Sequence, residues 1–322
     1  LGYTHFQAAQ PTTIGKRAAL WLQDFLFDVR DFERLEETLP FLGAKGATGT
    51  QASFLTLFES DDKKVIELEK LIAEEFGFTH VIPISGQTYT RKVDLNLLNA
   101  FTSFAASAHK MGTDLRLLAH EGEMVESFAD TQVGSSAMPY KRNPIYAERA
   151  CALARFVISL TQNPIYTLAT QWLERSLDDS ANRRLAIPEA FLGMDALLNV
   201  LLHLVEHLQP MPDVALQKLQ AAIPMLSMEN ILMHAVKKGG DRQELHEKLR
   251  RHLNIQNVDE FAAFIAKDPS FRLQPEQIEP LLNISSLIGR AAEQVEEFLK
   301  QESSLFSRLE KRPMPQRFLV EI

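Results

Sequence analysis

One short stretch of the chain gathers several side chains that could do chemistry: Gly134-Ser135-Ser136-Ala137-Met138-Pro139-Tyr140-Lys141-Arg142-Asn143-Pro144. It supplies two hydroxyls, an amine, a guanidinium and an amide, and it leads into an expected helix. The N–H groups and the dipole of a helix N-terminus favour anions. The stretch could therefore hold a carboxylate or stabilise an alkoxide. The competing interpretation is a polar loop between helices that caps the next one.

A second group combines two guanidiniums with a hydroxyl. Arg175, Ser180 and Arg184 are spaced by five and four residues. This set suits a phosphate, because arginine can offer it two parallel hydrogen bonds. The competing interpretation is a solvated helix face whose arginines form ion pairs with the acidic residues nearby.

A third pattern is of the metal-binding kind. His203-Leu204-Val205-Glu206-His207 fits the H-x-x-E-H pattern of some metalloproteases. Both histidines would share a helix face and could bind zinc. Five-residue patterns with two free positions also arise by chance, and the surrounding helix is rich in leucine. We therefore expect helix packing here, and the same for Cys151.

Composition narrows the class of protein. The 322 residues are 45% hydrophobic and 24% charged, with a formal net charge of −8 and one cysteine. An acidic chain lacks the basic face of a generic nucleic-acid binder. A single cysteine excludes an internal disulfide and fits a reducing, cytoplasmic setting. Polar residues interrupt the apolar stretches before about 18 positions, so no membrane span is expected.

The elements that must position these groups are predicted to be helices. Glycine is scarce, with 14 residues, which disfavours many tight hairpins. Apolar periodicity predicts helices over residues 10–37 and 145–160, the second with proline near its start. Two further stripes have helical spacing: Leu98, Phe101, Ala105, Ala108, Gly112, Leu115 and Ala119, and then Leu197, Leu198, Leu201, Leu202, Val205 and Leu208. The prediction is an all-α fold built as a bundle of long helices.

The predicted organisation has two parts. Gln209-Pro210-Met211-Pro212 is a plausible boundary. We expect a central helical-bundle domain over residues 1–209 and a smaller helical domain over residues 210–322. The chain starts at Leu1 without methionine or a leader-like segment, which suggests a cut into a longer protein. The Gly-rich stretch over residues 41–58 matches neither common nucleotide-binding glycine pattern.

The stretch from Gly134 to Pro144 resembles the GSSxMPxKxNP signature of the fumarase/aspartase lyase superfamily. Its variant in this chain is similar to that of the adenylosuccinate lyase family. Further segments that resemble this family are Gly2–Gln7, Ser85–Arg91, Gln171–Arg184 and Gly239–Gln243. The resemblance runs from Leu1 to about His252. In the family an N-terminal domain and the first part of the helical domain precede it.

The resemblance implies a C–N lyase of purine nucleotide biosynthesis. Such an enzyme eliminates fumarate from adenylosuccinate, giving AMP, and from SAICAR, giving AICAR. By resemblance Ser135 is the base and His5 the acid, a role that suits histidine because it titrates near neutrality. The implied substrate contacts are Thr4, which could also orient His5, then Lys141 and Asn143 at the succinyl carboxylate, Gln87 and Arg149 at the succinyl or base end, and Arg175, Ser180 and Arg184 at the phosphate.

The resemblance also implies a homotetramer whose active sites are shared between subunits, with a small nucleotide substrate and no metal or organic cofactor. No nucleic acid or membrane partner is expected. We further expect His5 and the Ser135 loop at opposite ends of the long helices, so that different subunits must supply them. The alternatives are another superfamily lyase, such as argininosuccinate lyase, and a non-catalytic structural relative.

Overall fold

The computed structural model describes residues 1–127, 138, 141–255 and 257–313, and these residues are predominantly helical, as predicted. The long helices are α1 (Ile14–Thr38), α4 (Lys92–Glu121), α5 (Ile145–Leu160), α7 (Asp179–His207), α8 (Pro212–Lys237) and α13 (Ala291–Leu309). The shorter ones are α2 (Ala52–Leu57), α3 (Asp62–Glu75), α6 (Gln162–Thr170), α9 (Arg242–Arg251), α10 (Val258–Lys267), α11 (Pro275–Ile278) and α12 (Ile284–Leu287). Two 3₁₀ turns cover Pro269–Phe271 and Glu279–Leu282. Two small sheets contain β1 (Tyr3–Thr4) with β2 (Gln7–Ala8) and β3 (Met124–Glu126) with β4 (Leu208–Pro210).

The described residues divide into two compact units. The larger unit contains Leu22–Leu117 and Glu126–Leu208. The smaller contains Leu1–Trp21, Leu118–Val125 and the described part of Gln209–Gln316. The smaller unit thus combines the C-terminal helices with the N-terminal hairpin and the end of α4, segments that are distant in sequence.

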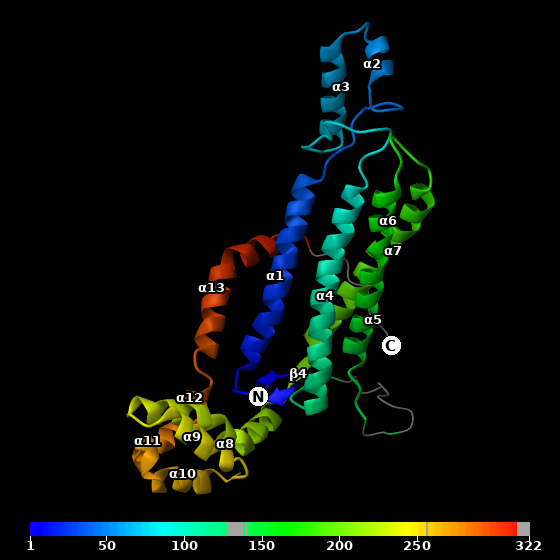
Figure 1. Cartoon of the computed structure of the whole chain (residues 1–322). Coiled ribbons are helices and arrows are strands. Elements are labelled where there is room, and N and C mark those ends of the chain that lie inside the picture. Colours follow the sequence, from blue (N-terminus) through cyan, green and yellow to red (C-terminus); the bar gives the residue numbers. More distant parts are fainter. Residues whose placement is uncertain (128–137, 139–140, 256, 314–322) are drawn as a thin grey trace. The chain divides into compact units, whose positions relative to one another are not determined.

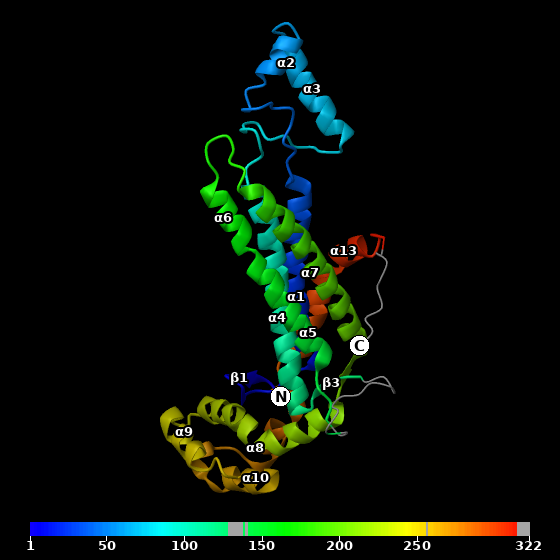
Figure 2. The ribbon, with the colours of Figure 1, turned by 90° about the vertical axis from the view of Figure 1, so that its right-hand side faces the viewer.

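The larger unit is a bundle of long helices (Figures 1 and 2). α1 and α4 run antiparallel, since Phe25 lies near Phe104 and Phe32 near Phe101, with ring centroids 5.2 and 5.9 Å apart. α4 and α5 approach closely at Gly112, where a methyl group would lie 2.8 Å from the buried Cys151 sulfur. The small residues of the first predicted stripe therefore allow close helix packing, as expected.

α5 and α7 also run antiparallel. The ring of Tyr146, at the start of α5, lies 4.1 Å from that of His203, near the end of α7. Midway, Gly193 of α7 lies so close to α5 that a methyl group there would be 3.1 Å from Val157. The predicted helix over residues 145–160 matches α5 in full.

The predicted apolar stripe on α7 is only partly buried. Leu197 and Leu201 are buried, whereas Leu198, Leu202 and Val205 are exposed. Successive side chains on a helix point about 100° apart. A packed element that covers one residue therefore leaves the next one exposed to solvent. By length and composition α7 could also cross a membrane, a test that core helices of soluble proteins pass too. One such helix is weak evidence for a membrane span, and the expectation that the chain has none stays a prediction.

The smaller unit has its own apolar core. Phe261 and Phe271 are fully buried there among residues of α8 to α12. The N-terminal hairpin joins this unit through Tyr3, whose hydroxyl donates to the Glu123 carboxylate at 2.7 Å. The segment before α1 therefore lies beside the segment after α4. The expectation that His5 and the Ser135 loop lie at opposite ends of the long helices stays a prediction, because Ser135 lies outside the described residues.

Candidate active site

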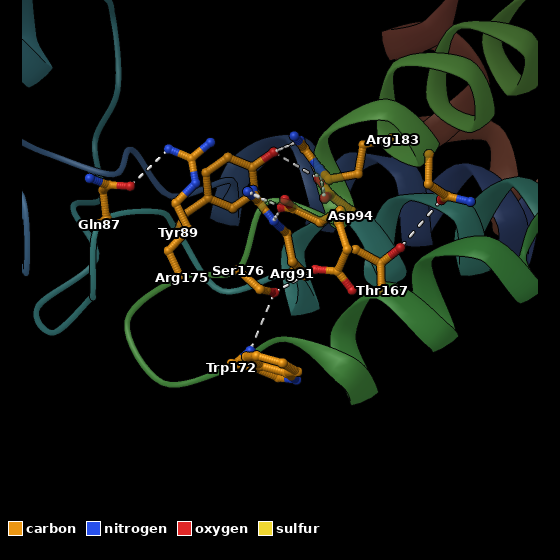
Figure 3. A network of polar contacts seen from close by, with 12 residues as sticks. Gln87, Tyr89, Arg91, Asp94, Thr167, Trp172, Arg175, Ser176 and Arg183 are labelled. Carbon is orange, nitrogen blue, oxygen red and sulfur yellow. Dashed lines mark hydrogen bonds and ion pairs between the residues drawn. The ribbon is translucent and has the colours of Figure 1, made fainter.

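Two loops of the larger unit bring Arg175 and Gln87 together. The Arg175 guanidinium donates to the Gln87 side-chain oxygen at 2.8 Å, and the Gln87 backbone N–H donates to Glu174 at 3.1 Å (Figure 3). Gly86 permits this approach, because a methyl group there would lie 2.5 Å from the Glu174 carbonyl oxygen. Both side chains are exposed, so polar atoms are presented to solvent at this point.

Ser180 and Arg184 lie one turn apart at the start of α7, just after the Arg175 loop. In the described part of the chain no side chain caps this helix N-terminus. The Asp178 carboxylate instead accepts from Ser176 at 2.5 Å. Within the described residues, neither Arg175 nor Arg184 forms the ion pair with a nearby acid that the competing interpretation required. An anion placed here would meet cationic side chains and helix N–H groups.

A buried network that the sequence analysis missed lies beneath these residues. Arg91 contacts one Asp179 oxygen through Nε at 2.6 Å and Nη2 at 2.5 Å, and both side chains are almost fully buried. Arg183 contacts Asp94 at 2.5 Å. The Tyr89 hydroxyl donates to Asp94 at 2.8 Å and accepts from Arg183 (Figure 3). Burial and the Asp94 carboxylate raise the pKa of Tyr89, so the phenol remains a donor.

A second group of predicted residues lies at the start of α5. Lys141 is exposed and its backbone N–H donates to Met138 at 3.0 Å. Asn143 and Arg149 are half-buried, one before the helix and one in its second turn. The predicted base, Ser135, and its neighbour Ser136 lie outside the described residues.

The N-terminus of α5 is already occupied by a carboxylate of the same chain. Glu126 accepts from the backbone N–H groups of Tyr146 at 3.0 Å and Ala147 at 2.8 Å. Burial of this carboxyl raises its pKa, although both hydrogen bonds act in the opposite direction. The expectation that this helix N-terminus offers its N–H groups to an external anion is wrong for these two groups. Lys141 and Asn143 stand outside that contact.

Thr4 and His5 form a third group, in the smaller unit. Both are exposed in the hairpin that joins β1 to β2. His5 and Phe6 have φ angles of 53° and 56°, a left-handed conformation that costs on the order of 1 kcal/mol in residues other than glycine. Such strained turns often occur at functional sites, and this one leaves the imidazole accessible.

The first two groups are far apart within one chain. Ser180 lies in the first turn of α7. His203, which contacts Tyr146 of α5, lies near the C-terminal end of the same helix. At 1.5 Å per residue, this places them about 35 Å apart. A small substrate therefore cannot contact Ser180 and the start of α5 in the same subunit.

His203 and His207 stack on each other at 4.1 Å. Within the described residues no three His, Cys, Asp or Glu side chains form a group that could hold a metal ion.

Comparison with known proteins gives two family matches. Residues 1–158 match the lyase family model, and residues 224–298 match the model described as the adenylosuccinate lyase C-terminus. Adenylosuccinate lyase of Schizosaccharomyces pombe is 45% identical over 312 residues, covering 94% of this chain and 65% of the relative. That of Archaeoglobus fulgidus is 30% identical over 306 residues, covering 93% of this chain and 67% of the relative. The chain thus spans about two thirds of these relatives.

Solved structures with the same fold have lower sequence identity. The 3-carboxy-cis,cis-muconate lactonizing enzyme of Pseudomonas putida superposes with a TM-score of 0.79 at 22% identity, covering 95% of this chain and 67% of that one. A fumarate lyase of Mesorhizobium has a TM-score of 0.77 at 22% identity, covering 93% of this chain and 66% of that one. At such identities the likeness concerns the fold.

Proposed function

Because the chain belongs to the adenylosuccinate lyase family, we propose that the protein it represents is an adenylosuccinate lyase. It would eliminate fumarate from adenylosuccinate, leaving AMP, and from SAICAR, leaving AICAR, in cytoplasmic purine nucleotide biosynthesis. The observation that carries this proposal is the Arg175–Gln87 contact beside Ser180 and Arg184 at the start of α7. These donors suit the phosphate shared by both substrates.

The proposed reaction is a β-elimination. Ser135 takes a proton from the succinyl carbon next to a carboxylate, and the electron pair collects on that carboxylate. The C–N bond then breaks, and His5 gives its proton to the departing nitrogen. Lys141 and Asn143 would hold the carboxylate while its charge grows, and such preorganised donors often make the largest catalytic contribution. The exposed position of His5 in a strained turn supports its access to substrate.

We further propose a homotetramer with shared active sites. The separation of about 35 Å between the Ser180 and Tyr146 ends of α7 and α5 supports this assembly, because two groups from one chain cannot contact one substrate. The outer side of α7 offers a matching surface. Leu185 and Leu192 share one side of the helix and are 70% and 64% exposed, and Phe191, Leu198 and Val205 share another and are 51%, 41% and 58% exposed. Monomers rarely leave so long an apolar face in water.

The alternative lyases differ in what they bind. Argininosuccinate lyase acts on a substrate without phosphate, so it does not need the Arg175, Ser180 and Arg184 set. The direct test is fumarate release, followed by absorbance, from adenylosuccinate and from argininosuccinate. We expect turnover of adenylosuccinate only. Turnover of argininosuccinate alone, or of neither substrate by the full protein, would contradict the proposal.

A further inference from the structure

We infer that two crossed, largely buried ion pairs, Arg91–Asp179 and Arg183–Asp94, position the phosphate-binding residues of α7. This inference rests on the proposed phosphate site, and it assigns positioning roles to residues that do not themselves contact the substrate. The two pairs link the N-terminal region of α4 to the first turns of α7. Each side contributes one cation and one anion: Arg91 and Asp94 come from the α4 side, Asp179 and Arg183 from α7.

The arrangement is specific because the two pairs share one aromatic ring. The guanidinium carbons of Arg91 and Arg183 lie 4.6 and 5.2 Å from the centre of the Tyr89 ring. The phenol hydroxyl closes the network by donating to Asp94 and accepting from Arg183. Figure 3 shows Arg91, Arg183 and Asp94 gathered beside Tyr89. Asp94 and Tyr89, on the α4 side, thus hold the charged guanidinium of Arg183 in one orientation.

Each of the two network residues on α7 immediately precedes a proposed phosphate contact. Asp179 immediately precedes Ser180, and Arg183 immediately precedes Arg184. Neighbouring helix positions face about 100° apart, so a residue held inward fixes where the next one points. Tyr89 stands two residues after Gln87, the acceptor of Arg175. The same network therefore restrains both loops that carry the proposed site.

Because these charges are largely buried, we infer that the ion pairs fix the geometry of the site rather than only stabilise the fold. Buried ion pairs often contribute little net stability, because desolvation offsets their attraction. Asp179 also keeps one buried oxygen without a hydrogen-bond partner among the described residues. Such a costly arrangement fits a role in fixing geometry, where a shift of about 1 Å can cost a large factor in activity.

The inference makes a prediction with a definite sign. The variant Asp94→Asn keeps the side-chain shape but removes a negative charge near the phosphate site. If Asp94 acted only through its negative charge, which repels phosphate, then phosphate would bind more tightly to the variant. If Asp94 acts by positioning Arg183 and hence Arg184, phosphate should bind less tightly. We expect the second result, with a loss of about tenfold, which is part of what a charge-assisted hydrogen bond is worth.

The measurement is titration calorimetry of AMP and adenosine with the full-length protein. The readout is the dissociation constant of adenosine divided by that of AMP, a ratio that isolates recognition of the phosphate. Asp94→Asn and the milder variant Tyr89→Phe should both lower this ratio. In a protein that already carries Arg184→Ala, adding Asp94→Asn should change the ratio little further, because Asp94 acts on the phosphate through Arg184. Asp268→Asn serves as control, since it removes an ion pair with Lys248 in the smaller unit and should leave the ratio unchanged.

The outcomes separate the two claims. An unchanged or increased ratio in Asp94→Asn and Tyr89→Phe would overturn the positioning role while leaving the phosphate site intact. Additive losses in the double variant would overturn it as well. If the unaltered protein bound AMP and adenosine equally, the proposed phosphate site itself would fail, and the inference with it. A variant of Asp94 that does not fold leaves Tyr89→Phe to decide.

Discussion

Tyr146 and His203 lie with their rings 4.1 Å apart, which fixes the antiparallel pairing of α5 with α7. As a result, the start of α5 meets the end of α7. The candidate carboxylate-binding residues Lys141 and Asn143 therefore lie at the opposite end of this helix pair from Ser180. This relationship carries the proposal that each active site is built from more than one subunit.

The first prediction concerns the base. Ser135→Ala should lower turnover by at least about 10²-fold, the lower end for a positioned acid or base. Binding of substrate should persist, since the proposed phosphate and carboxylate contacts remain. Ser136→Ala is the matched control and should be much milder. Steady-state fumarate release gives both values, and equal losses at the two serines would contradict the assignment of roles.

The second prediction concerns the phosphate. Arg175→Ala and Arg184→Ala should each weaken AMP binding, because each removes a charge-assisted hydrogen bond of roughly 1.5–3 kcal/mol. Arg175→Ala also frees the Gln87 side chain, so its effect should be the less specific of the two. Adenosine binding should be largely indifferent to Arg184→Ala. Equal weakening of AMP and adenosine would mean that these arginines are structural.

The third prediction concerns the Glu126 carboxylate. Glu126→Gln keeps one acceptor for the two N–H groups of α5, so the variant should lose about 1–3 kcal/mol of stability. Burial raises the pKa of Glu126 above its usual value near 4.5. Protonation of Glu126 therefore stabilises the folded state. This stabilisation is present at pH values below the usual pKa, and it is lost as the pH rises through the raised pKa of the folded state.

Urea unfolding of both proteins between pH 4 and 8 checks this sign. The stability of the unaltered protein relative to Glu126→Gln should fall as pH rises, since the other groups titrate alike in both. A relative stability that grows with pH would mean that the two hydrogen bonds outweigh burial of the carboxyl.

The fourth prediction concerns the exposed face of α7. Leu185→Glu and Leu192→Glu place charges on apolar side chains that a second copy would cover. We expect light scattering to report dissociation of the tetramer, with helical circular dichroism preserved. Ile66→Glu on α3, also at an exposed apolar position, is the control and should leave the mass unchanged. A tetramer that survives both α7 substitutions would place the interface elsewhere.

The sequence predicted local features well. Helix α5 follows from apolar periodicity and from Pro144, and both of its bounds were predicted. Helix α1 begins at Ile14 rather than at residue 10, because the Thr13 hydroxyl caps it by accepting from the Lys16 backbone N–H at 3.1 Å. On α7, periodicity identified an apolar helix but could not tell which side its neighbours cover.

The parts of the site that could not be predicted depend on distant partners. Arg91 meets Asp179, and Glu126 meets Ala147, through the tertiary fold, and no spacing rule joins residues so separated. The adjacent pair Arg183-Arg184 was visible in the sequence. Only the structure, however, shows one guanidinium turned to a buried carboxylate and the other exposed.

The central claim, a site shared between subunits, is tested most directly by complementation in the full-length protein. At a substrate concentration well below the KM of either variant, Lys141→Ala and Arg184→Ala should each be nearly inactive alone. When the two are mixed and their subunits exchange, up to about a quarter of the sites should combine both wild-type groups, so activity should return. If subunit exchange is demonstrated and activity does not return, one chain supplies both groups and the account is contradicted.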